Sequence, residues 1–391
     1  MRNKVTIFSM ILLFAIYACK ESNIQEDNSV NIHVRYNTNN INIGDYLQYD
    51  SYIVLETTED CLISQVDRIE FFNQRIYILD SKVATIFIFD YKGKFLNKID
   101  KKGSGEGEYI GIEDFVIDTK RNMIYLLDRI AGNIMQYDFS GNFFNKVNIE
   151  TGYTFLTLRN QDWLIYLGNG SSRMSDLYNL KLYNTDGQLI NKFLPFNRAL
   201  AGITYSVSTT KSIFYKYDNE LYILPLLSNI IYIYNEETNQ LHVKYKINFP
   251  EGTNDNINEN STEADVKNFR AKLYTGEISS DIHNFYKIKD LIFFQFFYQK
   301  KRFFCLFNET LDQIESSEKR LFDENGLFFE PIRYFSDKEE DKVLSILQGG
   351  QFNTCKEITK DNNSSVINEI DKSIGMEEDP NPILIWYSLK K

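Results

Sequence analysis

Short apolar runs alternate with polar turns along this chain. Residues 76–79 and 86–89 are runs of β-branched and aromatic side chains that are too short to form helices. A polar turn containing Asp90 and Gly93 separates them from a further run at 94–99. Asp tolerates tight backbone geometry and Gly supplies a positive φ, so this turn predicts a β-hairpin.

The same pattern repeats along the chain. Residues 76–99 align without gaps with residues 124–147, at an offset of 48, and ten of the 24 positions are identical. A third copy follows at 183–192, and weaker copies lie at 221–240 and 291–312. Further strand candidates complete four short strands in each copy. Four short strands repeated every 40 to 50 residues are typical of β-propeller blades, whose faces are buried against neighbouring blades.

The chain length predicts six blades. Residues 50–389 comprise 340 positions, of which two polar stretches, 252–276 and 356–382, look like insertions. Without them the length corresponds to six units of about 48 residues, although five or seven blades stay possible. We therefore predict an all-β protein, a β-propeller of six four-stranded blades over residues 50–391. The insertions carry apolar residues at helical spacing over 262–273 and 365–374, so we expect them to be partly helical.

The two ends of this region predict how the ring closes. Residues 383–389 and 52–56 are isolated strand candidates at opposite ends of the chain. We expect them to share the final blade with the runs at 328–334 and 343–347. Pairing of the chain ends would remove exposed sheet edges.

The N-terminus has the features of an export signal. Arg2 and Lys4 precede an uncharged, largely apolar run at 5–18, which is shorter than the about 20 residues of a membrane span. We predict a signal peptide over 1–18. Residues 16–19 (IYAC) resemble the lipobox of bacterial lipoproteins. This resemblance implies cleavage before Cys19 and lipid attachment to its thiol; the alternative is a plain secretory signal that contains a cysteine.

Residues 19–49 are predicted to form the lipidated N-terminus and a polar tether. Residues 20–29 contain a single apolar residue and show no periodicity. Several acyl chains on Cys19 would hold the protein stably at a membrane. We therefore expect a cell-envelope protein, anchored in the outer membrane on its periplasmic or its outer side. Acidic Glu21, Glu26 and Asp27 match surface-display signals only loosely, so the membrane leaflet stays open.

Composition and charge narrow the classes of function. Thirty Phe and 26 Tyr against two Trp and six Pro favour packed, pleated surfaces. A net charge of −11 argues against nucleic acid as a partner, because nucleic acid requires a basic face.

The sequence offers few residues for metal or nucleophilic chemistry. Besides Cys19, the chain has Cys61, Cys305 and Cys355, an odd number without a CxxC pair. The three histidines, His33, His242 and His283, are far apart in the sequence. We expect free thiols, no metal site and no cofactor, and we assign no catalytic residue.

Two further motifs allow both a functional and a structural interpretation. The glycine-rich stretch 103–107 could cradle a phosphate, but no Lys-Ser/Thr follows it and its two Glu would repel phosphate. A tight loop between blades explains it better. Asp80 and Asp128 each end a strand and could line a cation ring, although such residues more often cap turns by binding backbone amides.

These residues also carry a family resemblance. The segments 103–109 (GSGEGEY), 115–118 and 124–128 resemble the inter-blade pattern of NHL-repeat propellers. Together with residues 52–58, the lipobox and Trp386-Tyr387, they make the chain similar to six-bladed β-propeller lipoproteins of Gram-negative bacteria. That family has no defined activity, so the resemblance implies a fold and a location but no catalytic residues.

Three functional hypotheses follow. The first is a non-catalytic binding module that holds a partner protein, peptide or glycan. The alternative is an enzyme, such as a lyase or glycoside hydrolase, with two or three ionisable side chains converging at the mouth of the central channel. The third is a structural subunit of an envelope complex, for which a large exposed apolar patch on the outer strands or on the 262–273 helix would speak.

The lipid anchor is testable by replacing its attachment residue. In a Cys19→Ala variant the thiol that carries the lipid is absent, so we expect the protein to move from the membrane fraction to the soluble fraction. Cell fractionation followed by immunoblotting measures this. Membrane attachment as firm as that of the wild type would refute lipidation at Cys19.

Overall fold

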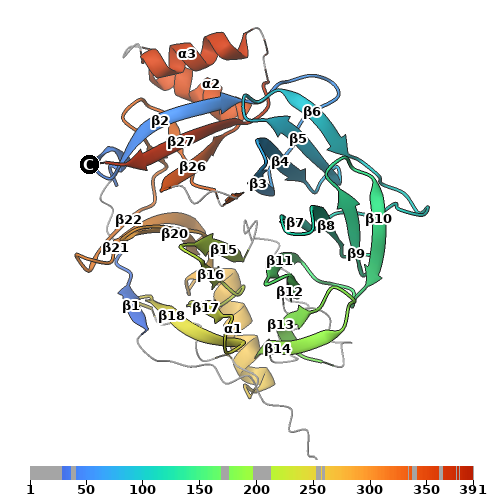
Figure 1. The fold of residues 1–391 in the computed structure, drawn as a ribbon. Coiled ribbons are helices and arrows are strands. Elements are labelled where there is room, and N and C mark those ends of the chain that lie inside the picture. Colours follow the sequence, from blue (N-terminus) through green and yellow to red (C-terminus); the bar gives the residue numbers. More distant parts are fainter. Residues whose placement is uncertain are drawn as a thin grey trace, which may run out of the picture.

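The computed structural model describes residues 29–36, 41–168, 176–196, 213–251, 257, 260–332, 334–336, 341–360, 364–375, 377 and 379–390. The predicted signal peptide and Cys19 lie outside the described residues. Six small sheets stand around a common axis in a ring (Figure 1), which confirms the predicted six-bladed β-propeller. None of the helices in this part of the chain is long and apolar enough to cross a membrane.

The first three blades are regular four-stranded antiparallel sheets. Blade 1 consists of β3 (Arg68–Phe72), β4 (Arg75–Asp80), β5 (Thr85–Asp90) and β6 (Phe95–Ile99). Blade 2 consists of β7 (Asp114–Asp118), β8 (Met123–Asp128), β9 (Asn133–Asp138) and β10 (Phe143–Asn148). Blade 3 consists of β11 (Phe155–Arg159), β12 (Asp162–Tyr166), β13 (Tyr178–Tyr183) and β14 (Leu189–Pro195). The aligned residues 76–99 and 124–147 therefore take equivalent places in two successive blades, as the repeat predicts.

The hairpin turns explain why the repeat is well preserved in these blades. Asp90 Oδ1 accepts hydrogen bonds from the backbone N–H groups of Lys92 and Lys94, both at 2.9 Å. Gly93 has φ +83°, and a Cβ at this position would lie 2.0 Å from a backbone oxygen of β2 (Leu47–Val54). The turn thus needs a side-chain acceptor at its start and glycine near its end.

Blades 4 and 5 keep the four-stranded plan with strands of less uniform length. Blade 4 consists of β15 (Phe214–Tyr217), β16 (Glu220–Ile223), β17 (Ile230–Asn235) and β18 (Gln240–Asn248). Blade 5 consists of β19 (Ser280–Ile288), β20 (Leu291–Tyr298), β21 (Lys301–Asn308) and β22 (Gln313–Ser317).

Blade 6 closes the ring with strands from both ends of the chain. Here β27 (Ile383–Leu389) pairs antiparallel with β2 on one side and with β26 (Lys342–Leu347) on the other. The pairing runs from Leu47 opposite Leu389 to Val54 opposite Ile383. The predicted closure by the two chain ends is therefore confirmed.

The stretch 328–334, expected as one strand of this blade, is divided among three partners. Phe328–Phe329 forms β24 and pairs with β23 (Leu321–Phe322). Pro331 makes an isolated bridge to Ser345 of β26, and Tyr334 begins β25 (Tyr334–Ser336), which pairs in parallel with β3 of blade 1. Pro331 lacks a backbone N–H and cannot continue a ladder, so the strand is interrupted there.

The N-terminal segment is structured well before residue 50, which corrects the expected extent of the polar tether over 19–49. β1 (Val30–His33) adds to the outer strand β18 of blade 4 in a parallel pairing. Beyond it, Tyr36 stacks on Tyr298 of blade 5 with ring centroids 4.6 Å apart. A 3-10 turn, η1 (Ile43–Asp45), follows, and the Tyr46 hydroxyl donates to Glu315 of β22. This N-terminal segment, described over residues 29–36 and 41–46, thus contacts blades 4 and 5 and leads into β2 of blade 6.

Three helices lie outside the ring. α1 (Glu263–Thr275) and α3 (Ser365–Ile374) are the two helices predicted within the insertions, and a capping box between Thr262 and Asp265 begins α1. α2 (Gly349–Ile358) begins before residue 356, where we placed the start of the second insertion. Its first residues, Gly349 and Gly350, are poor helix formers, so the sequence pattern gave no sign of it. α2 and α3 lie beside blade 6 (Figure 1).

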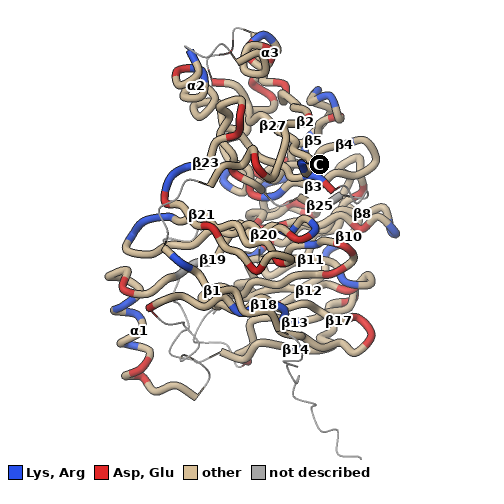
Figure 2. The backbone as a smooth tube through the Cα atoms, turned by 90° about the vertical axis from the view of Figure 1, so that its left-hand side faces the viewer, with Lys and Arg blue, Asp and Glu red and all other residues tan. Residues whose placement is uncertain are grey.

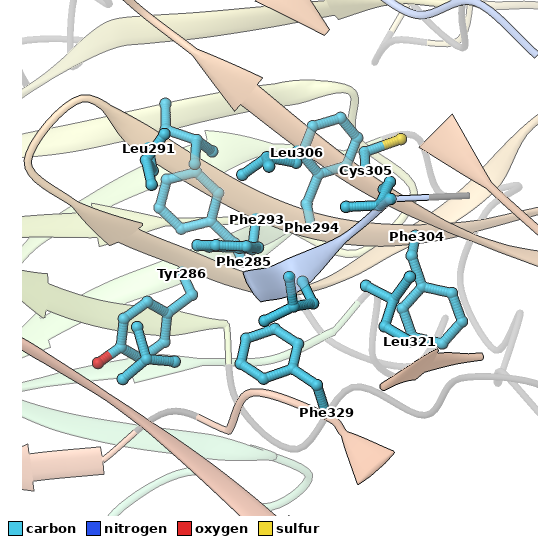
Figure 3. Close-up of a cluster of buried hydrophobic side chains, with 14 of the residues drawn as sticks. Phe285, Tyr286, Leu291, Phe293, Phe294, Phe304, Cys305, Leu306, Leu321 and Phe329 are labelled. Carbon is cyan, nitrogen blue, oxygen red and sulfur yellow. The ribbon is translucent and has the colours of Figure 1, made fainter. Parts of the chain in front are cut away.

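The hydrophobic core consists mainly of the layers between neighbouring blades. Between blades 1 and 2, for example, Tyr77 and Leu79 pack with Phe115 and Leu126 in one buried cluster. A larger cluster joins blades 4, 5 and 6, and Figure 3 shows its aromatic part around blade 5. Inner strands are buried on both faces, which accounts for their continuously apolar sequences.

The contribution of the N-terminal segment to stability is testable in β1. Ile32 is fully buried, and truncation by Ile32→Ala should lower the free energy of unfolding by about 2 kcal/mol or more, because it leaves a cavity. Chemical denaturation measures this. Its neighbour His33 is exposed on the same strand, so His33→Ala should change stability by less than about 0.5 kcal/mol. Equal stability of Ile32→Ala and wild type would show that β1 is dispensable.

Candidate functional site

Three ionisable side chains meet on the innermost strands, which face the ring axis in Figure 1. Arg68 and Glu70 belong to β3, and Asp114 begins β7. Arg68 Nη2 lies 2.7 Å from Glu70 Oε1, and Arg68 Nη1 lies 3.1 Å from both carboxylate oxygens of Asp114. We call these residues the axial charge cluster.

Backbone groups of a third blade complete the axial charge cluster. Arg68 Nη1 donates to the Leu156 carbonyl at 2.7 Å, and the Leu156 N–H donates to Asp114 Oδ2 at 2.8 Å. The Ile117 N–H donates to Glu70 Oε2 at 3.1 Å. The cluster therefore connects β3, β7 and β11 and holds blades 1, 2 and 3 in register.

Burial sets the charge state of the axial charge cluster. Arg68, Glu70 and Asp114 are 2%, 4% and 1% exposed. Burial raises the pKa of Glu70 to about 7, against the opposing effects of Arg68 and the Ile117 N–H. Burial also raises the pKa of Asp114, again opposed by Arg68. One cation between two acids is neutral when one acid keeps its proton, and all three side chains are almost fully buried.

The structural interpretation of Asp80 and Asp128 is confirmed. Asp80 Oδ2 accepts from the Ser64 N–H at 2.7 Å and Oδ1 accepts from the Lys82 N–H at 3.1 Å. Asp128 accepts in the same way from the Ile110 N–H at 2.8 Å. Each carboxylate therefore caps loops at the end of its strand.

The glycine-rich stretch 103–107 is a tight loop and cannot cradle a phosphate. The Gly105 N–H donates to Glu108 Oε2 at 2.7 Å. A Cβ at Gly103 would lie 2.0 Å from the same oxygen, so the Glu108 carboxylate already occupies the concave side of the loop. Its negative charge would repel an anion there.

Metal and thiol chemistry find no support in the described residues. No group of three or more His, Cys, Asp or Glu side chains there is placed to hold a metal ion. The three histidines lie on three different strands, β1, β18 and β19. Cys61, Cys305 and Cys355 are buried free thiols, as expected, and burial raises the pKa of Cys355 to about 11.

A second polar cluster, which the sequence pattern did not indicate, lies between blades 2 and 3. The fully buried Lys181 on β13 places its Nζ 2.7 Å from Glu150 Oε2, which also accepts from the Tyr153 hydroxyl at 2.9 Å. Tyr153 and Tyr183 hydroxyls lie 2.7 Å apart. Burial raises the pKa of Tyr183 to about 12, so it remains protonated and cannot serve as a base near neutral pH. A lysine within a strand looks like a solvent-facing position, which is why the pattern did not reveal it.

Exposed apolar residues on the outer strands are scattered. Leu96, Phe144 and Ile190 take equivalent positions on β6, β10 and β14, and each is exposed. Leu189 beside Ile190 is also exposed, but one or two such residues on each of three separate blades do not amount, in the described chain, to the large continuous patch expected of a structural subunit.

Within the described residues, two open grooves are candidate binding surfaces. The β2–α3 groove, of about 690 Å³, is lined by Tyr52, Ile53, Val54, Leu55, Glu56, Thr57, Tyr91, Lys92, Gly93, Lys94, Ser373, Ile374, Glu377 and Pro380. The blade 5–6 groove, of about 360 Å³, is lined by Lys301, Arg302, Phe304, Glu318, Lys319 and Arg320. Neither is centred on the axial charge cluster.

The β2–α3 groove runs along a strand edge. Its floor includes residues 52–54 at the end of β2, which in the described chain has a strand partner, β27, on one edge only. Residues 55–57 continue the floor beyond the strand, where the Glu56 N–H donates to the Gly93 carbonyl at 2.8 Å. The turn of blade 1 forms one wall, and α3 forms another, where the Tyr52 and Ser373 hydroxyls lie 2.9 Å apart. Such an arrangement can bind an extended chain through backbone hydrogen bonds and contacts with Tyr52 and Tyr91.

Because the pKa of Glu70 is raised in the folded protein, the contribution of this residue to stability should decrease as the pH rises. The folded protein holds the carboxyl proton more tightly than the unfolded chain, whose pKa is about 4.5. The stabilisation that comes from this tighter proton binding is fully present below pH 4.5 and is lost as the pH rises to about 7. In Glu70→Gln the side chain is neutral at every pH. The unfolding free energy of the variant minus that of the wild type should therefore increase by up to about 3 kcal/mol over this window.

Urea denaturation at a series of pH values measures the difference. Glu106→Gln is the matched control, because Glu106 is exposed in a loop and its substitution should give a flat profile. A flat profile for Glu70→Gln as well would show that Glu70 titrates normally.

Comparison with solved structures finds several similar proteins, and the first of them supports the fold. A protein from Bacteroides fragilis NCTC 9343 that is described as exported matches with a TM-score of 0.71 and 18% identity, over 93% of this chain and all of that chain. A member of the duf4221 family from Bacteroides vulgatus ATCC 8482 matches with a TM-score of 0.49 and 8% identity, over 88% and 98% of the two chains. A streptogramin B lyase matches with a TM-score of 0.44 and 12% identity, over 89% and 99%.

Sequence comparison gives the family. No curated protein matches the chain. A family model described as a domain of unknown function (DUF4934) matches residues 28–388, which include all six blades and the N-terminal segment. At 18% identity the B. fragilis structure supports the fold and not a shared activity. The chain is thus a six-bladed β-propeller that belongs to the DUF4934 family.

Proposed function

We propose that this protein is an exported, lipid-anchored binding module of the cell envelope that does not itself catalyse a reaction. The proposal is supported by the contrast between the axial charge cluster and the β2–α3 groove. The axial charge cluster is sealed from solvent and internally compensated, whereas the β2–α3 groove is an open strand edge flanked by a helix. Enzymes need ionisable groups that reach a substrate, and binding modules need accessible edges and pockets.

The proposed location rests on the N-terminus. A lipid on Cys19 and the polar residues 20–29 would connect the membrane to β1, which begins at Val30. The similar B. fragilis protein described as exported supports the same location. Outer-membrane anchoring follows from the resemblance to Gram-negative propeller lipoproteins.

The proposed ligand is an extended peptide segment of a partner protein. It would add to the unpaired edge of β2, where main-chain hydrogen bonds provide affinity and the side-chain contacts provide selectivity. Tyr52 and Tyr91 offer partly exposed aromatic surfaces for alternate side chains of such a segment. Lys92 and Lys94 on the turn of blade 1 are exposed and would favour acidic residues at that end of the peptide.

A peptide and glycan array with the purified protein tests the proposal, followed by steric blocking of the groove. Ser373→Trp places an indole at the groove wall and should weaken binding of the selected ligand at least about tenfold. Lys372→Trp is the matched control, since Lys372 is exposed on the same helix but does not line the groove, and it should leave the affinity within about twofold.

Three outcomes would contradict the proposal. Equal weakening by both tryptophan variants would place the ligand elsewhere on α3. Selection of glycans without peptides would replace the peptide by a saccharide as the ligand. Turnover of any substrate by the protein alone would make it an enzyme.

A further inference from the structure

The blade 5–6 groove is cationic in a protein of net charge −11. Four cations and one acid line it. Figure 2 shows Lys and Arg at the start of β21 and in the connection leading to β23, on one side of the molecule. Lys301 is paired with Glu318 at 2.8 Å, but in the described chain Lys319 and Arg320 have no carboxylate partner. The groove therefore keeps a local positive charge that an anion can neutralise.

Two arginines of the groove are held in place by aromatic rings. The Arg302 guanidinium carbon lies 5.3 Å from the Phe304 ring centroid, and that of Arg320 lies 5.1 Å from the Phe328 ring centroid. Stacking fixes the plane of a guanidinium and leaves its N–H edges available. Arg302 is also paired with Glu330 at 3.1 Å, which restrains it further. Preorganised arginines lose little conformational freedom when they bind an oxyanion.

We propose that the blade 5–6 groove binds a phosphomonoester, with Arg302 and Arg320 on the phosphate. Lys301 and Arg302 are paired with Glu318 and Glu330, which leaves a net charge of about two from Lys319 and Arg320. This charge favours a phosphate, which carries about −1.5 to −2 charges near neutral pH, over a singly charged carboxylate. The groove volume of about 360 Å³ suits a small phosphorylated molecule. This site is separate from the β2–α3 groove and does not depend on peptide binding there.

Isothermal titration of the purified protein with glucose 6-phosphate and with inorganic phosphate tests the proposal. Arg320→Gln should weaken glucose 6-phosphate binding at least about tenfold, because it removes an arginine that has no carboxylate partner. The matched control is Lys300→Gln, which removes an exposed cation next to the groove that does not line it and should leave the affinity within about twofold.

The Ser373→Trp variant should bind both probes like the wild type, which distinguishes failure at this site from failure at the β2–α3 groove.

A sedimentation experiment with vesicles identifies the kind of molecule that carries the phosphate. Sedimentation with phosphatidic acid vesicles, but not with pure phosphatidylcholine vesicles, would assign the phosphomonoester to a lipid headgroup, provided that Arg320→Gln abolishes it. Two results would overturn the proposal. One is no binding of either soluble probe or of the anionic vesicles. The other is equal weakening by Lys300→Gln and Arg320→Gln, which would indicate diffuse attraction without a site.

Discussion

A small antiparallel sheet with two apolar faces can hide both of them only when it has a neighbour on each side. In this propeller that condition is met by a closed ring, and closure depends on β27 between β2 and β26. The interaction joins residues from opposite ends of the chain, so it forms only when the whole chain has folded. The packing between the other blades depends on it, because a gap at one place would expose two apolar faces.

The molecule reinforces its ring where the repeat is weakest. Blades 1 to 3 follow the sequence repeat closely and carry Asp or Asn and Gly in their hairpin turns. Blades 4 to 6 depart from it, and these are the blades covered by the N-terminal segment and by α2 and α3. The N-terminal segment is held on blade 5 by the stacking of Tyr36 on Tyr298 and by the hydrogen bond from the Tyr46 hydroxyl to Glu315. Where the sequence repeat is weak, contacts between residues far apart in the chain thus stabilise the blades.

The buried polar groups also differ between the regular blades 1 to 3 and the irregular blades 4 to 6. In the regular half, Arg68, Asp114 and Lys181 are buried in networks that bond blade to blade and leave nothing for a ligand. The β2–α3 groove lies where blade 6 meets the turn of blade 1. The blade 5–6 groove lies along β21 and the connection that follows blade 5. Each groove therefore includes residues of an irregular blade.

The sequence by itself determined the features that depend on near neighbours in the chain. The alternation of runs and turns gave the strands, the offset of 48 gave the blades, and Thr262 with its acidic first turn gave α1. It also indicated that the two ends would meet, because each left a strand without a local partner. The tertiary structure alone decided the rest: the parallel addition of β1 to β18, the transfer of β25 to blade 1, and the meeting of Arg68 with Asp114. These depend on which blades become neighbours and on how their strands are in register. Packing between the blades determines which of these residues come close together, and no local pattern of apolar and polar residues encodes this.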